Sequence, residues 1–183
     1  RACVREYQAS YPDQAILARV TGLDPEKTVR LSYERENIKD IQVEGSVMTV
    51  RAATMDDLHP FAVRILALTD GRVIPDGREM SVRGATELRL VISVATGGEP
   101  SLPGDGFDAL WTRATADHAR LMERSYIRLD QGDDPKRHDM TVPQRLKRVR
   151  EGDVDGGLLD LYYQFGRYLM VGSSRPGTLP ANL

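Results

Sequence analysis

The chain has 183 residues and a formal net charge of -2, and 40% of its residues are hydrophobic while 28% are charged. These proportions are typical of a folded globular protein that holds one domain or parts of two. The near-neutral charge argues against nucleic acid or an acidic membrane surface as a partner, and no apolar run approaches the ~20 residues that span a bilayer.

The chain starts with Arg1-Ala2-Cys3, which is neither a Met start nor a charged-then-apolar signal segment. We therefore expect the true N-terminus to lie upstream, so the missing signal segment carries no information about export. Cys3 is the only cysteine, which excludes an internal disulfide and a cysteine-based zinc site.

Up to residue 100, short apolar runs alternate with turn sequences, which predicts half-buried antiparallel strands. Three runs each place apolar residues on one strand face: Met48, Val50 and Ala52; Phe61, Val63, Ile65 and Ala67; Leu88, Leu90, Ile92 and Val94. Further strands are predicted at 3–9, 14–21, 29–35, 41–43 and 78–83. Thr69-Asp70-Gly71 and Pro75-Asp76-Gly77 are turn sequences in which glycine tolerates positive φ. About eight strands at this spacing predict a sandwich, incomplete at its N-terminal side.

The segment 97–104 is rich in glycine and proline and marks a domain boundary. A helix is predicted from there to about residue 126, with Asp105 as N-cap and Asp108 completing a partial capping box. Its apolar residues keep helical spacing: Phe107, Leu110, Trp111, Ala114, Leu121 and Met122. An exposed polar loop is predicted at 130–139, and a short helix at 143–150.

A more apolar helix is predicted from residue 155 to about 171, with Gly172 as its cap and a loop fixed by Pro176 and Pro180 after it. Six residues form one stripe that we expect to be buried: Leu158, Leu161, Tyr162, Phe165, Tyr168 and Leu169. Leu159, Tyr163 and Met170 are apolar on the other side, so the helix needs neighbours around most of its circumference. The chain supplies few of them.

The run FGRYLMVGSSRPGTLPANL at 165–183 resembles the first barrel helix and the following loop of glycoside hydrolase family 95. Members of that family are inverting α-L-fucosidases, and some act on α-L-galactosides. Upstream, REYQASYPDQ at 5–14 is similar to a strand transition in the family's N-terminal sandwich, and RLKRVREG at 145–152 resembles its approach to the barrel. The likeness covers nearly the whole chain, strongly at the C-terminal end and more loosely between residues 22 and 140.

The resemblance implies an α+β fragment of a larger enzyme. Residues 1–100 would be the later part of an antiparallel β-sandwich, 101–141 a linker with a helix, and 142–183 the truncated start of an (α/α)6 catalytic barrel. In the family a glutamate acts as general acid, and an aspartate with neighbouring asparagines activates the water. These residues lie beyond Leu183, so no catalytic residue is assigned to this chain, which we expect to be inactive.

The substrate implied is a fucosylated oligosaccharide or glycan, hydrolysed without a cofactor, and the family likeness is compatible with a periplasmic or extracellular location. Two other interpretations stay open. The protein could be a related sandwich-plus-barrel enzyme of another specificity, such as an α-L-galactosidase or a phosphorylase, or a non-catalytic carbohydrate-binding domain. Widely spaced aromatics in the sandwich favour a structural role for it over glycan binding.

Arg175 and Asn182 are the candidate substrate-binding residues, because a fixed guanidinium and amide suit sugar hydroxyls. An equally good interpretation is that both hold the loop by bonding backbone carbonyls. No metal site is predicted: the histidines 59, 118 and 138 lack metal-site spacing, and the acidic pairs at 56–57 and 133–134 suit solvated loops. The basic cluster at 145–150 suits a solvated helix face, and the aromatics at 162–168 suit a core better than sugar stacking.

Overall fold

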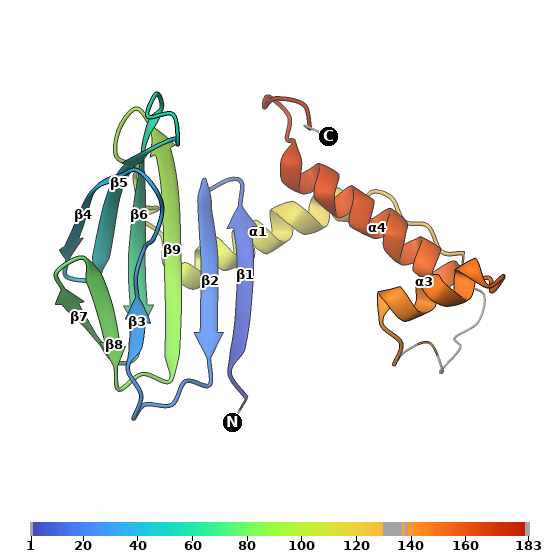
Figure 1. The fold of residues 1–183 in the computed structure, drawn as a ribbon, viewed down its shortest axis with the longest axis horizontal. Coiled ribbons are helices and arrows are strands. Elements are labelled where there is room, and N and C mark those ends of the chain that lie inside the picture. The colour runs from blue at the N-terminus through green and yellow to red at the C-terminus, as the bar shows by residue number, and fades with distance from the viewer. Residues whose placement is uncertain (1, 130–136, 138, 182–183) are drawn as a thin grey trace. The chain divides into compact units, whose positions relative to one another are not determined.

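A computed structural model of the chain describes residues 2–129, 137 and 139–181. Its contacts divide it into two compact units, Arg1–Asp117 and His118–Leu183. The first unit holds the strands and most of the first helix, and the second holds the remaining helices (Figure 1). The described helices all lack the length and apolar character needed to cross a membrane.

The strands of the first unit form two antiparallel sheets. A six-stranded sheet has the order β1-β2-β9-β6-β5-β4, and a three-stranded sheet has the order β3-β8-β7. The strands are β1 Val4–Ser10, β2 Ala15–Thr21, β3 Val29–Leu31, β4 Ile38–Glu44, β5 Val47–Ala53, β6 Pro60–Thr69, β7 Arg72–Asp76, β8 Glu79–Arg83 and β9 Glu87–Thr96. The predicted antiparallel sandwich is therefore confirmed.

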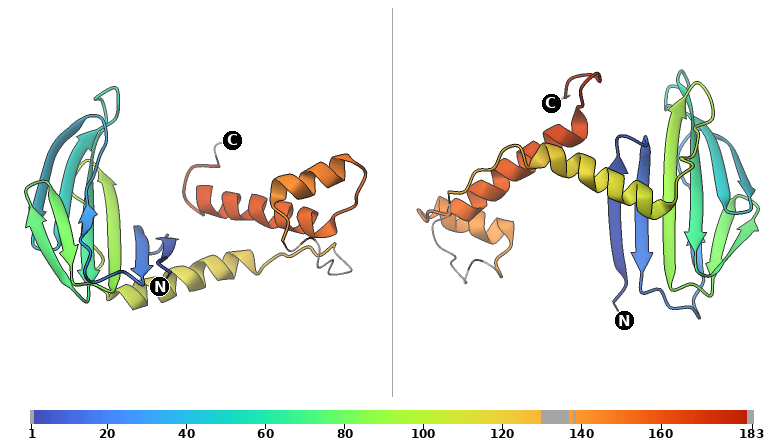
Figure 2. Two further views of the ribbon diagram at one scale, coloured as in Figure 1. Left: turned by 60° about the horizontal axis from the view of Figure 1, so that its bottom comes forward. Right: turned by 180° about the vertical axis from the view of Figure 1, so that it is seen from behind.

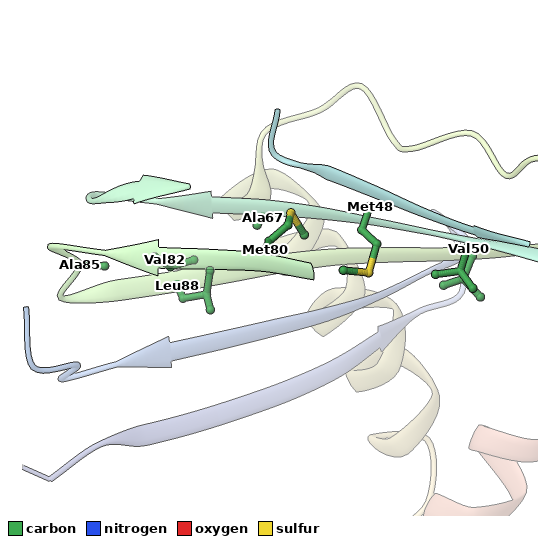
Figure 3. Packing of buried hydrophobic residues seen from close by; sticks show 8 residues of the cluster. Met48, Val50, Ala67, Met80, Val82, Ala85 and Leu88 are labelled. Atoms are coloured by element: carbon green, nitrogen blue, oxygen red, sulfur yellow. The ribbon is translucent and has the colours of Figure 1, made fainter. Parts of the chain in front are cut away.

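The main hydrophobic core lies between the two sheets (Figure 3). Met48 and Val50 of β5 face Met80 and Val82 of β8, and all four side chains are at most 1% exposed. Burying each such side chain contributes about 1.5–3 kcal/mol. The three strand faces predicted from the alternation all contribute to this core, which is why the register of β5, β6 and β9 is fixed.

The first helix, α1 Phe107–Met122, covers the opposite face of the large sheet (Figure 2). Phe107, Leu110 and Ala114 follow helical spacing and pack against Leu17 of β2 and Val91 of β9. Within the first unit the layers are thus the small sheet, the large sheet and the start of α1. The alternation of apolar residues predicts half-buried strands, but β2 and β9 are covered on both faces.

Strand β7 was missed because its sequence ends in the proline and aspartate of a predicted turn. Proline is tolerated there because β7 lies at the edge of the small sheet. Asp76 pairs with Glu79, so only Gly77 and the following residue form the connection, and Gly77 has the expected positive φ of 61°. Gly71 has a different role, because a Cβ at this position would lie 2.4 Å from the carbonyl oxygen of Arg83.

Asp70 joins the end of β6 to the start of β9, its neighbour in the large sheet. Its carboxylate accepts hydrogen bonds from the Thr86 hydroxyl and from the backbone N–H groups of Thr86 and Glu87, the latter two at 3.0 Å. These bonds, led by that of the Thr86 hydroxyl, lower the pKa of Asp70 to about 2. The turn predicted at Thr69-Asp70-Gly71 is thus stabilised by its aspartate.

Several predicted helix ends are corrected by the structure. Helix α1 begins at Phe107, and the Leu110 N–H bonds to the Gly106 carbonyl. The carboxylates of Asp105 and Asp108 instead pair with Arg113 at 2.7 Å and with Arg89 at 3.1 Å, so the capping box predicted there is wrong. Helix α1 also ends four residues before the predicted limit.

In the second unit, α3 spans Val142–Arg150 and α4 spans Gly156–Ser173, close to the predicted ranges. Gly172 lies inside α4 and is not its cap, since the helix ends at Ser173 and Ser174 is extended with φ of −146°. The loop predicted at 130–139 lies outside the described residues except at 137 and 139.

Candidate functional site

The second unit brings α3 and α4 together, and each helix begins with a side chain that bonds its first turn. At the start of α3, the Gln144 Oε1 accepts hydrogen bonds from the Thr141 backbone N–H at 2.7 Å and from its hydroxyl at 3.0 Å. At the start of α4, the Asp155 carboxylate accepts from the Leu158 N–H at 2.9 Å. These bonds fix where the two helices begin, because the first N–H groups of a helix lack partners within it.

Asp155 also joins the two helices through an ion pair. The Arg145 guanidinium of α3 donates to both carboxylate oxygens, at 2.8 and 2.7 Å, and the Asp155 side chain is only 3% exposed. The hydrogen bond from Arg145 lowers the pKa of Asp155 to about 2. The interpretation of the basic cluster as a solvated face is therefore wrong for Arg145, which is half-buried and holds α4 in place.

Beside this ion pair lies an apolar groove of about 630 Å³ between α3 and α4. Its walls come from Val142, Leu146 and Val149 of α3, from Asp153, Val154 and Asp155 of the connection, and from Leu158, Leu159, Leu161, Tyr162 and Phe165 of α4. Of the residues on α4, only Leu158 is buried. Tyr162 is 78% exposed and Phe165 is 55% exposed.

The expectation that the α4 stripe is buried therefore holds for Leu158 and fails for its other five residues. Helical spacing places Leu161, Phe165 and Leu169 on α4 as predicted, but each is between 46% and 55% exposed. Exposed contiguous apolar surface of this kind marks an interaction site. The preference for core over sugar stacking at 162–168 is likewise not met within the described chain, where Phe165 and Tyr168 stack at 6.3 Å between centroids.

Arg167, which the sequence analysis did not single out, links α4 to the end of α1. Its guanidinium donates to the carbonyl oxygens of Leu121 at 2.9 Å and Met122 at 2.7 Å, and also to that of Ser125. The last carbonyls of a helix lack partners within it and attract a positive charge. An arginine alone in a strongly apolar helix was the signal that could have identified this contact.

The loop after α4 turns at Arg175 and Thr178. The Thr178 hydroxyl accepts from the Arg175 N–H at 2.9 Å, and the Thr178 N–H donates to the Arg175 carbonyl at 3.0 Å. Gly177 occupies the turn with φ of 86°. The Arg175 residue is half-buried, and the second candidate, Asn182, lies outside the described residues. The proposed pairing of the two candidates at a sugar subsite therefore stays a prediction.

Two sequence profiles match this architecture. The profile of the glycosyl hydrolase family 95 catalytic domain matches residues 106–183, which contain α1, α3 and α4. The profile of the glycosyl hydrolase family 65 N-terminal domain matches residues 2–100, which contain both sheets. Alpha-L-fucosidase 2 of Arabidopsis thaliana is 24% identical over an alignment that covers 98% of this chain. The chain therefore contains a glycosyl hydrolase family 65 N-terminal domain, and its C-terminal part is similar to the family-95 catalytic domain.

The chain spans 27% of the length of the Arabidopsis relative. Its fold class is α+β, with an antiparallel sandwich followed by helices, as the sequence predicted. The groove between α3 and α4 lies within the part that matches the family-95 catalytic domain.

The other candidate residues either make structural contacts or lie outside the described part of the chain. The His118 ring meets Tyr168 edge-on at 5.8 Å, and Asp57 pairs with Lys39 at 2.8 Å. His138 and the acidic pair at 133–134 lie outside the described residues. Over the ranges that the structure describes, no three metal-binding side chains gather at one place.

Proposed function

We propose that the complete protein hydrolyses terminal α-L-fucosides of glycans with inversion at the anomeric carbon. The observation that carries this proposal is the match of residues 106–183 to the family-95 catalytic domain. The name of the Arabidopsis relative, an α-L-fucosidase, supports fucose as the sugar. A fucosylated oligosaccharide is then the substrate, and no cofactor is required for hydrolysis of this type.

We further propose that the 183-residue chain alone is inactive. An inverting enzyme needs one protonated carboxylic acid and one carboxylate, separated by about 6.5–9.5 Å so that water fits between them. Asp155 is unsuited to the acid role because Arg145 lowers its pKa to about 2, so it has no proton to donate at neutral pH. Asp153 beside it is bound by Arg137 at 3.2 Å and Arg148 at 2.9 Å.

The exposed apolar surface of α4 supports a second element of the proposal. We propose that residues 142–183 are the start of an (α/α)6 barrel, 1–100 the sandwich and 101–141 the linker between them. Further helices of the catalytic domain would then cover the groove. This explains why α4 is apolar around most of its circumference while the described chain buries only Leu158 of its side chains.

A comparison of one variant in two contexts tests this coverage. In the 183-residue chain, Phe165→Ala should cost less than about 1 kcal/mol, because Phe165 is 55% exposed. In the complete protein it should cost about 3–5 kcal/mol, measured by denaturant unfolding. Phe107→Ala, at a position 3% exposed, should be strongly destabilising in both. An equally small effect of Phe165→Ala in both contexts would contradict coverage by further helices.

The activity itself is tested with the complete protein and 2'-fucosyllactose, following the released sugar by NMR. Release of β-L-fucose is expected, whereas release of α-L-fucose would contradict inversion. Release from an α-L-galactoside alone would favour the α-L-galactosidase alternative, and release that requires phosphate would favour a phosphorylase. Glycan binding without release would favour a non-catalytic carbohydrate-binding protein.

A further inference from the structure

A polar hollow of about 290 Å³ lies on the large sheet, over β4, β5 and β6. It is on the same face that α1 covers at β2 and β9. It is lined by Gln42 and Glu44 of β4, by Val47, Thr49 and Arg51 of β5, by Arg64 of β6, and by Glu99 from the segment after β9. We call this site the sheet hollow. All of its residues belong to the first unit, so its floor is a rigid set of three neighbouring strands.

The floor is built on one row of the sheet register. Gln42 pairs with Thr49, Thr49 with Arg64, and Arg64 with Ser93 on the next strand. Side chains directly opposite on neighbouring strands share a face, so these polar groups point to the same side. The same face of the sheet is apolar around Leu17 and Val91, where it packs against α1. The polar row on the adjacent strands therefore differs from the rest of this face.

Hydrogen-bonding capacity at this row is left unmet. The Arg64 Nε and the Ser93 hydroxyl oxygen are buried, and neither has a hydrogen-bond partner among the described residues. Neither atom can be reached from the hollow, because both are buried. A ligand in the hollow would instead meet the outer part of the Arg64 guanidinium, since Arg64 itself lines the site. Arg51 on the adjacent strand is different, because it binds Asp40 at 2.8 Å and also Glu99.

The charges of the sheet hollow define the ligand. Two arginines and two glutamates line it, so their charges balance. The site therefore does not favour a charged ligand of either sign. Planar guanidinium, carboxylate and amide groups offer donors and acceptors side by side, which suits a neutral ligand with several hydroxyl groups. The volume lies at the lower limit of ligand sites, near 300 Å³, and therefore favours a single small ring.

We propose that the sheet hollow binds one sugar residue of a glycan, with Arg64 and Glu44 as its main hydrogen-bonding groups. The choice of a sugar among neutral polyols rests on the proposed function, while the site itself rests on the geometry of the sheet. The sandwich is then more than a structural domain. It holds a second glycan-binding position, separate from the catalytic domain in sequence.

The test is an NMR titration of the 183-residue chain with 2'-fucosyllactose, L-fucose and, separately, inorganic phosphate. Sugar should shift the amide resonances of Gln42, Thr49 and Arg64. Arg64→Met should weaken this binding at least tenfold without lowering the unfolding temperature, since the native Nε has no partner to lose. Arg72→Met is the matched control, because Arg72 is exposed on β7 of the other sheet, and it should leave binding unchanged.

Three results would overturn the proposal. These are the absence of sugar-induced shifts at the hollow, shifts with phosphate but not with sugar, and full affinity in Arg64→Met. Shifts confined to α3 and α4 are one form of the first result, and they would leave the catalytic proposal intact. The hydrolysis assay on the complete protein judges that catalytic proposal separately, so failure of one does not decide the other.

Discussion

Replacing Leu110 by alanine is expected to weaken the packing of the start of α1 against the large sheet. Leu110 is 0% exposed and is the central contact between α1 and the apolar patch of Leu17 and Val91. The change removes three carbon atoms, worth about 0.8 kcal/mol each on transfer from water, and leaves a cavity. We therefore expect a loss of about 3 kcal/mol in the free energy of unfolding.

The chain offers a direct probe for this measurement, because Trp111 is its only tryptophan. The indole stacks on Phe107 at 5.7 Å and lies under the Arg19 guanidinium at 4.8 Å, so its emission reports the docking of α1. For a unit of this size, a loss of about 3 kcal/mol lowers the unfolding temperature by roughly 10–15 °C. Trp111 fluorescence and the far-ultraviolet signal of the sheet should be followed together.

Leu58→Ala is the matched control, because it makes the same chemical change at a side chain that is 71% exposed. It should alter the free energy of unfolding by less than about 0.5 kcal/mol. The packing of α1 would be refuted if Leu110→Ala cost less than about 1 kcal/mol and left the emission of Trp111 unchanged. A red shift of Trp111 before the sheet unfolds would show that the helix detaches by itself.

Other variants test individual features. Gly71→Ala should destabilise the first unit by about 2–3 kcal/mol, because its Cβ would meet a β8 carbonyl oxygen at 2.4 Å, whereas Gly98→Ala in open space should be neutral or slightly stabilising in the same thermal assay. Asp155→Asn should destabilise the second unit by about 2–4 kcal/mol at neutral pH, measured by helical circular dichroism. The folded pKa of Asp155, about 2, lies below the ordinary 3.8. The difference in stability between the two proteins should therefore be present above about pH 4 and shrink as the pH falls toward 2. A difference in stability that does not depend on pH would contradict the ion pair. In the complete enzyme, Arg175→Ala should lower kcat/KM for an α-L-fucoside by about tenfold if Arg175 contacts the sugar, and an unchanged kcat/KM would leave it as a loop-holding residue.

The sandwich was predictable because strand alternation is a local signal. Met48, Val50 and Leu88 each lie on the predicted face, and the core between the sheets follows from them. The second apolar contact was harder to predict, because Val91 sits within an almost continuous apolar run, where alternation does not separate one buried face from two. Covering it requires α1, which is distant in sequence from β2.

The missed features depend on contacts that local patterns do not encode. Pro75 signals a turn in any sequence, and only its place on an edge strand makes it compatible with β7. Gly71 is read from sequence as a positive-φ residue, but its small size is what the neighbouring backbone requires. Arg145 and Arg167 look like solvated cations until their partners, Asp155 and the end of α1, are placed beside them.

The same distinction explains the candidate site. The spacing of Leu158, Tyr162 and Phe165 correctly identifies one side of α4, because periodicity depends only on the helix itself. Burial depends on other elements that pack against the helix. Within the described chain they bury only Leu158. An 18-residue helix that keeps large apolar side chains exposed would lose several kcal/mol of available stabilisation. The simplest explanation is that further helices of the catalytic domain cover these side chains. We therefore propose that the groove is an internal packing surface of that domain and not an open pocket.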